Sequence, residues 1–142
     1  QDIIDRTNAL RCENGVAALT VNEKLMQAAQ VRAEEMAASG VYSHTRPDGR
    51  KYTTVTDCKY IGENIHLIGE WQIRDSSLPS FAVEAWKNSA AHLKNMLNTR
   101  YHAIGVGVSQ GTVMGEPYWY CVQLFLLDGY NVTWVDAPAA KG

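Results

Sequence analysis

Four side chains in this sequence have types and surroundings that suit binding or catalysis: His44, Glu63, Ser89 and His92. Imidazole and carboxylate groups bind divalent metals and transfer protons, and a serine hydroxyl becomes a nucleophile when a base lies beside it. Ser89 and His92 are three residues apart in a segment predicted to be helical, so we expect them on one helix face. His44 lies just before an Arg-Pro-Asp-Gly sequence at positions 46–49, which is typical of a type I turn.

Glu63 is informative because of the strand that the sequence predicts around it. Residues 61–68 alternate so that Glu63 shares one face with Ile61, Ile65 and Leu67. A carboxylate on an apolar face is costly unless a charged or hydrogen-bonding group meets it. We therefore predict that one or two imidazoles supply this partner across a cleft, which would make Glu63 the candidate catalytic residue if the protein is an enzyme.

Other catalytic and binding patterns are absent, and the cysteines are few. The chain has no G-x-S-x-G elbow, no H-E-x-x-H, no G-x-G-x-x-G, no phosphate-binding loop and no EF-hand. The remaining histidines, His66 and His102, are interpreted as surface or hydrogen-bonded core residues. Cys12, Cys58 and Cys121 lack the paired spacing of a zinc site and allow at most one disulfide. A Cys58–Cys121 bridge is favoured among the three pairings, and three free thiols are the alternative.

Length and composition predict one domain. The chain has 142 residues, of which 46% are hydrophobic and 20% charged, as in ordinary globular proteins. We expect a single domain over residues 1–142, with a core at about 3–127 and a tail over 128–142 that is frayed from Ala137. A net charge of −2 without a basic cluster argues against a nucleic-acid partner, and no apolar stretch is long enough to span a membrane. The chain starts at Gln1 without an apolar leader, which suggests a processed protein.

Hydrophobic periodicity places the candidate residues on an α+β framework. Helices are predicted over 2–11, 22–40 and 81–97, with a short helix after Asp48, and strands over 61–68, 104–108 and 118–127. The last two strands form an antiparallel hairpin around a loop at 111–117. Gly105 and Gly107 fall on one face of their strand, which favours the close approach of a helix backbone.

Five short motifs occur in order along nearly the whole chain and closely resemble the CAP superfamily. That superfamily contains the cysteine-rich secretory proteins, antigen 5 and plant pathogenesis-related proteins, and this chain is most similar to its bacterial SCP-like extracellular branch. The motifs are Ser43-His44-Thr45-Arg46-Pro47-Asp48-Gly49, Gly62-Glu63-Asn64-Ile65, Trp86 with Ser89, His92, Asn95 and Leu97, Ile104-Gly105-Val106-Gly107-Val108, and Gln123-Leu124-Phe125.

The resemblance implies a three-layer α-β-α sandwich with a central antiparallel sheet, secretion, and a cavity where two histidines meet two acids. His44 and His92 match the cavity histidines, and Glu63 matches the acid of the Gly-Glu-Asn motif. Ser89 stands where many relatives have the second acid. The cavity therefore lacks one negative charge, and we expect Zn²⁺ or another divalent cation on His44 and His92 to be held weakly.

Three functions are compatible with these residues. The first is a secreted, non-enzymatic binding module with a lipid, a peptide or a cell-surface component as partner. The second is a metal-dependent hydrolase or peptidase, with His44 and His92 as ligands and Glu63 as base or third ligand. The third is a structural domain of the cell envelope with a vestigial polar cluster. The missing second acid and the lack of an evident oxyanion donor favour the first function over the second.

Overall fold

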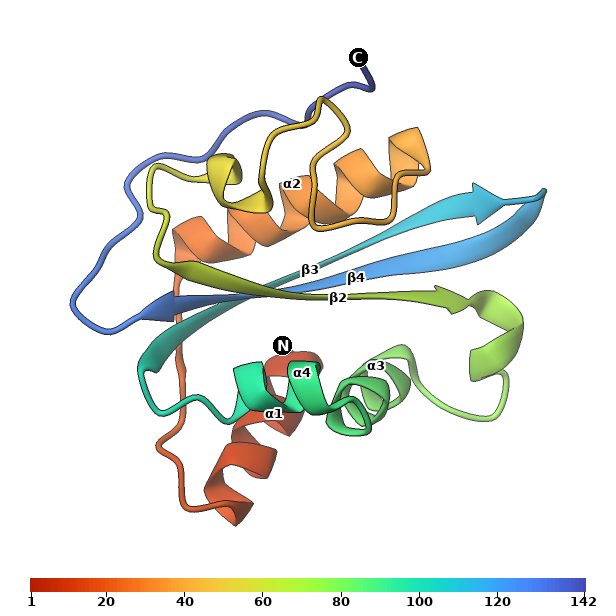
Figure 1. Ribbon diagram of the computed structural model, residues 1–142. Coiled ribbons are helices and arrows are strands. Elements are labelled where there is room, and N and C mark those ends of the chain that lie inside the picture. Colours follow the sequence, from red (N-terminus) through yellow and green to blue (C-terminus); the bar gives the residue numbers. More distant parts are fainter.

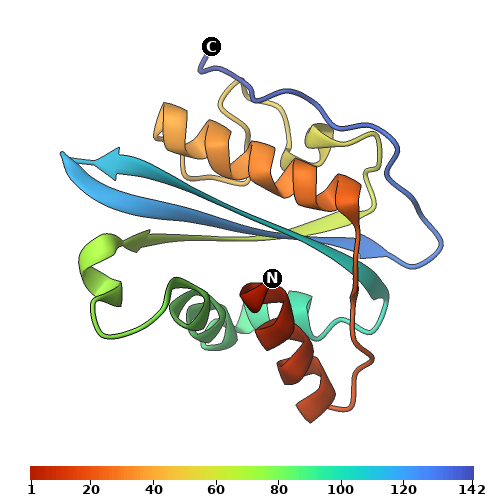
Figure 2. The same cartoon turned by 180° about the vertical axis from the view of Figure 1, so that it is seen from behind.

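The computed structural model describes residues 1–142 and shows three layers, with one sheet between two layers of helices (Figure 1). Helix α2 covers one face of the sheet, and α1, α3 and α4 cover the other, as the reverse view also shows (Figure 2). The predicted three-layer α+β architecture is therefore confirmed. No helix is both long enough and apolar enough to cross a membrane. The elements are α1 (Asp2–Glu13), β1 (Thr20–Val21), α2 (Glu23–Ser39), β2 (Ile61–Gly69), α3 (Leu78–Lys87), α4 (Ala90–Met96), β3 (Tyr101–Val113) and β4 (Glu116–Leu127), with 3-10 turns at Tyr52–Val55 and Glu70–Ile73.

The sheet has the order β1-β3-β4-β2, so that β2 is an edge strand. β4 pairs antiparallel with both β2 and β3, whereas the two-residue β1 runs parallel to β3. The β3–β4 hairpin is longer than predicted because its turn is only Met114 and Gly115, both with positive φ. Most of the predicted loop at 111–117 is therefore strand.

Helix α2 lies directly on the sheet because glycines remove the side chains beneath it. Asn22 caps the helix by accepting a 2.9 Å hydrogen bond from the backbone of Leu25. A Cβ atom on Gly105 would come within 2.5 Å of Met26 N, and one on Gly107 within 2.5 Å of Ala29 C. The predicted close approach of a helix at these two glycines is confirmed.

Two hydrophobic cores lie on opposite faces of the sheet and separate the cysteines. Cys58 belongs to the core beneath α2, and Cys121 to the core that faces the other helices. Cys12 is exposed on α1, and all three thiols are free. The favoured Cys58–Cys121 bridge is therefore wrong, because the sheet stands between the two side chains.

The helix predicted over 81–97 is two helices. α3 ends at Lys87, and Ser89 is the N-cap residue of α4, in an extended conformation. Asparagine and serine favour such a break because their side chains compete for backbone hydrogen bonds. Ser89 and His92 are thus the cap and the third residue of a new helix, not neighbours on one continuous helix face. The short helix predicted after Asp48 is a 3-10 turn at Tyr52–Val55.

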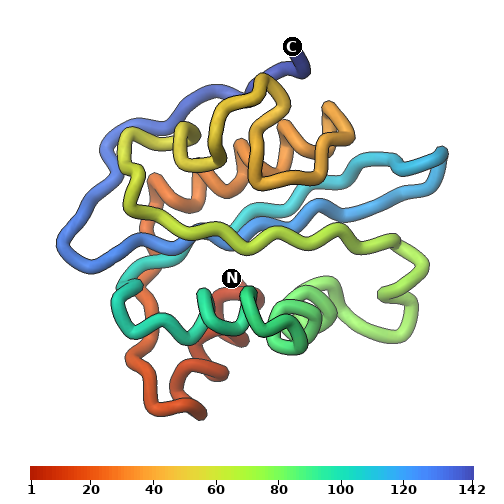
Figure 3. Tube along the Cα trace, in the orientation of Figure 1, coloured from red at the N-terminus to blue at the C-terminus, as the bar shows by residue number.

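The C-terminal tail is docked along the α2 side of the molecule, where the blue end of the trace runs beside the loop that follows α2 (Figure 3). Val132 is 4% exposed, and the backbone N–H of Asp136 donates to Val55 O at 2.8 Å. The tail stays bound beyond Ala137, since the N–H of Ala139 donates to Glu35 at 3.0 Å. The expected fraying from Ala137 is therefore wrong for these residues.

Candidate functional site

The candidate site surrounds the edge strand β2, whose side chains alternate between the two helical layers. Glu63 points to the α2 side, where it meets Arg32. Asn64 points to the opposite side, where its side-chain amide donates to the main-chain oxygen of His92 at 3.1 Å. Because no strand covers this edge, groups from the loop after α2 and from α4 reach the same stretch of β2.

Arg32 is the buried partner of Glu63. Its Nε donates to Oε2 at 2.7 Å and its Nη2 to Oε1 at 3.1 Å, and neither side chain is exposed. Burial alone would lower the pKa of Arg32, but hydrogen bonds and charge from Glu63 and then Glu35 outweigh it and raise the pKa. The prediction that one or two imidazoles supply the partner of Glu63 missed this arginine.

His44 is the second partner of Glu63 and lies at the surface. Its Nδ1 is 2.8 Å from Oε1 of Glu63, and its side chain is 54% exposed. Because the same carboxylate already accepts hydrogen bonds from Arg32, we assign the ring proton to Nδ1, which donates to Glu63. This tautomer leaves Nε2 of His44 with a free lone pair.

His92 lies on α4 and is held against β2 by a set of amides. Besides binding the His92 main chain, Asn64 accepts a 2.9 Å hydrogen bond from Asn95 of the same helix. The pKa of His92 is lowered by burial and then by the repulsion that a protonated His44 exerts, and this favours the neutral form of the His92 ring. A neutral imidazole has a lone pair available for a metal or a hydrogen-bond donor.

His66 lies close to this site, whereas Ser89 forms no hydrogen bond with its residues. His66 is half-buried two residues after Asn64 on the same face of β2, and its pKa is lowered by burial and then by His92. This histidine, interpreted above as a surface or hydrogen-bonded core residue, is thus a neighbour of His92. Ser89 makes no side-chain hydrogen bond to His44, Glu63 or His92. The structure brings His44 and Glu63 into contact and places His92 near enough to His44 for the two rings to influence each other's charge, and Ser89 is hydrogen-bonded to none of them.

The charged residues behind Glu63 form a buried network that the sequence analysis did not predict. Glu35 is unexposed and accepts a 2.7 Å hydrogen bond from Arg32 and a 2.9 Å hydrogen bond from Arg46. Arg46 also donates to Asp136 in the tail at 2.9 Å. Arg32 and Glu35 lie on the buried side of α2. Their spacing with the apolar residues of this helix is the sequence signal that could have identified them as buried.

The donors around β2 do not form a ready three-ligand metal centre. No group of three or more His, Cys, Asp or Glu side chains is arranged to hold a metal ion. The free nitrogens belong to the imidazoles, because Glu63 is occupied by Arg32 and His44. A metal held here would therefore have imidazole ligands with Glu63 behind them, and fewer protein ligands than a catalytic zinc centre usually has.

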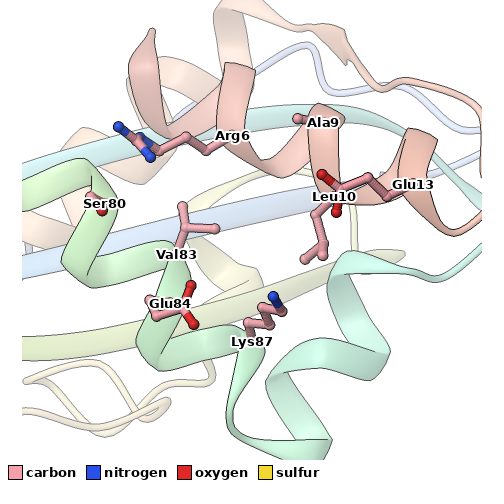
Figure 4. Close-up of a pocket in the computed structure, with 8 residues that line it drawn as sticks. All are labelled: Arg6, Ala9, Leu10, Glu13, Ser80, Val83, Glu84 and Lys87. Atoms are coloured by element: carbon pink, nitrogen blue, oxygen red, sulfur yellow. The ribbon is translucent and has the colours of Figure 1, made fainter.

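A separate cavity of about 210 Å³ lies between α1 and α3, away from these residues (Figure 4). Leu10 and Val83 form part of its apolar lining. Charged side chains from both helices surround that apolar part, and none of them forms an ion pair across the cavity. The charged residues are Arg6, Glu13, Glu84 and Lys87.

Comparison with known proteins identifies relatives of most of the chain. Residues 4–125 match the family model CAP, described as the cysteine-rich secretory protein family. The uncharacterized protein YkwD of Bacillus subtilis (strain 168) is 30% identical over 118 residues, which cover 82% of this chain and 45% of that protein. The chain spans less than half the length of the curated relatives it matches.

Solved structures share the fold. An extracellular SCP-domain protein from Bacillus anthracis str. Ames is 23% identical, with a TM-score of 0.63 over 89% of this chain and 39% of that chain. The structure described as NaASP2 with Zn²⁺ is 14% identical, with a TM-score of 0.64 over 100% of this chain and 85% of that chain. At these identities the likeness establishes the fold alone.

Proposed function

This chain belongs to the CAP family of cysteine-rich secretory proteins, and we propose that it is an extracellular binding module whose histidines His44 and His92 weakly hold a divalent transition-metal ion such as Zn²⁺. The observation that carries the proposal is the hydrogen bond between His44 Nδ1 and Glu63. Histidines that bind metals usually donate their other ring N–H to a carboxylate or carbonyl, which fixes the ring and its tautomer. His44 is held in this way with Nε2 free.

The binding is weak because the site is short of ligands and of negative charge. His44 and His92 supply two ring nitrogens, whereas closed zinc sites have four protein ligands and catalytic ones three. The negative charge of Glu63 is shared with Arg32, and Ser89 adds none. The relative solved with Zn²⁺ supports the choice of probe ion. A bound ion of this kind would supply a Lewis-acidic position that can accept a carboxylate or carbonyl from a partner.

The hydrogen bonds and the burial of Glu63 favour a binding function over hydrolysis. A carboxylate offers roughly four acceptor positions, and Glu63 uses three of them for Arg32 and His44. Its side chain is also unexposed, so it cannot contact a substrate-bound water as a general base. With Glu63 committed to holding His44, the residues bind and orient rather than transfer protons.

The charged cavity between α1 and α3 bears on the class of partner. A long aliphatic chain placed there would lie against the ionised side chains of Arg6, Glu13, Glu84 and Lys87. We therefore propose a peptide or cell-surface partner in preference to a lipid. Such a partner would donate a hydrogen bond to the free Nε2 of His44, or would place a carboxylate or carbonyl on a metal ion bound there.

Zinc titration by calorimetry tests the metal proposal. The wild-type protein should bind one Zn²⁺ near pH 7, and His44→Ala and His92→Ala should each weaken binding by roughly tenfold or more, as loss of a ligand requires. His102→Ala is the matched control, because His102 lies at the start of β3 and contacts none of the site residues. Absence of binding in the wild type, or an equal loss in the control, would contradict the proposal.

A further inference from the structure

The C-terminal residues Asp136–Ala139, here called the strap, bind two buried charged groups, Arg46 and Glu35. Asp136 accepts from Arg46 Nη1 at 2.9 Å, and the main-chain oxygen of Ala137 accepts from Arg46 Nη2 at 3.1 Å. The N–H of Ala139 donates to Glu35 Oε1 at 3.0 Å. The strap therefore forms hydrogen bonds with both Arg46 and Glu35, which form a buried ion pair with each other.

The strap and the imidazole site are connected by consecutive ion pairs. Arg46 and Arg32 bind Glu35 together, and Arg32 also holds Glu63, which binds His44. The side chains of these two arginines and two glutamates are all unexposed. Inside a protein such groups cannot exchange a lost partner for water without a large cost, so each depends on its neighbour.

Arg32 is shared between Glu35, on the side of the strap, and Glu63, on the side of the imidazole site. It donates to Glu35 from Nη1 and to Glu63 from Nε and Nη2. When the strap is docked, Glu35 also receives hydrogen bonds from Arg46 and Ala139. Without the strap, Glu35 loses one donor and Arg46 loses two acceptors, so the hydrogen bonds of Glu35 and Arg46 must be redistributed inside the network, and the position of Arg32 between Glu35 and Glu63 is no longer fixed.

We propose that the strap is a positioning element of the imidazole site, which keeps Arg32 on Glu63 and thereby fixes the ring of His44 for ligand binding. The part of this inference that concerns metal affinity rests on the function proposed above. The part that concerns the His44 ring does not. The strap acts through Arg46, Glu35, Arg32 and Glu63 and does not touch the ligand.

Two mild substitutions in the strap test the inference. Ala139→Pro removes the N–H that Glu35 accepts without changing charge, and Asp136→Asn removes the charge that faces Arg46. Ala140→Pro is the matched control, because no hydrogen bond is formed by the N–H of Ala140. Nitrogen-15 NMR of the imidazoles reports the His44 tautomer, and calorimetry reports the affinity for Zn²⁺.

In both strap variants we expect a smaller fraction of the Nδ1–H tautomer of His44 and an affinity for Zn²⁺ lower by roughly threefold or more, whereas the control matches the wild type. Asp136→Glu should restore both values. An unchanged tautomer in Asp136→Asn overturns the inference, even if Ala139→Pro fails to fold. If the wild type binds no Zn²⁺, the metal proposal fails, and the tautomer measurement alone still decides the role of the strap.

Discussion

Arg32 and Glu63 meet through two hydrogen bonds of 2.7 and 3.1 Å, with both side chains unexposed. This pair joins α2 to the edge strand β2, and His44 attaches to it from outside. The exposed imidazole is therefore held by a carboxylate whose own position is set by a buried guanidinium. A planar guanidinium suits this role because its donors match both carboxylate oxygens at once.

Glu63→Gln should destabilise the protein by about 3 kcal/mol, because it leaves the buried Arg32 with only one full carboxylate partner. The loss should be similar at pH 6 and pH 9, since arginine stays charged throughout this range. Urea unfolding at both pH values measures it. Glu34→Gln, at an exposed position of α2, should change the free energy of unfolding by less than about 0.5 kcal/mol. A loss that vanishes by pH 9 would show that His44, not Arg32, is the main partner.

The sequence predicted much of the fold and only the outer part of the site. The alternation around Glu63 correctly indicated a buried strand face and a carboxylate in need of a partner. The partner could not be identified from neighbouring residues, because Arg32 is 31 residues away from Glu63 in the sequence. Arginine occupies a buried helical position here because Glu35 and Glu63 both meet it.

The predictions of a Cys58–Cys121 bridge and of a frayed tail were wrong for a similar reason. Strand propensity placed Cys58 and Cys121 in or near strands, but the face that each residue occupies depends on packing that propensity does not encode. The small residues after Asp136 suggested fraying, whereas long-range hydrogen bonds to Arg46 and Glu35 hold them. Caps and turns, such as Asn22 before α2, were predictable because they are set by neighbouring residues.

Gly107→Ala should destabilise the protein by about 2 kcal/mol or more, because its new Cβ would lie 2.5 Å from Ala29 C and force α2 away from β3. Gly111→Ala is the matched substitution on the same strand. Its Cβ would lie 3.0 Å from Ala37 O, so a small shift suffices and the loss should be smaller. Thermal unfolding of both variants compares them, and equal losses would argue against direct seating of the helix on the strand.

The three thiols should differ in reactivity. Cys12 is exposed, whereas burial raises the pKa of Cys121 to about 12 and Cys58 is also buried. In the native protein at pH 8, iodoacetamide should therefore modify Cys12 alone. In urea without reductant it should modify all three cysteines, as mass spectrometry can count. Modification of a single cysteine in urea would reveal a disulfide between Cys58 and Cys121.

Acidification should destabilise the protein partly through His66. Its pKa in the folded state is lowered by burial and then by His92, so the unfolded chain takes up this proton first as the pH falls below about 7. Stability should therefore fall between pH 7 and pH 5 in the wild type, and less steeply in His66→Gln. Above about pH 7.5 the offset between the two proteins should be constant. Parallel curves over the whole range would contradict the lowered pKa.

The most direct test of the account is anomalous diffraction at the zinc edge from crystals soaked in Zn²⁺. We predict one ion bound by Nε2 of His44 and a ring nitrogen of His92 at about 2.0 to 2.1 Å, with Glu63 still hydrogen-bonded to Arg32. An ion ligated by Glu63 with Arg32 displaced, an ion bound away from both histidines, or no ion at all would contradict it.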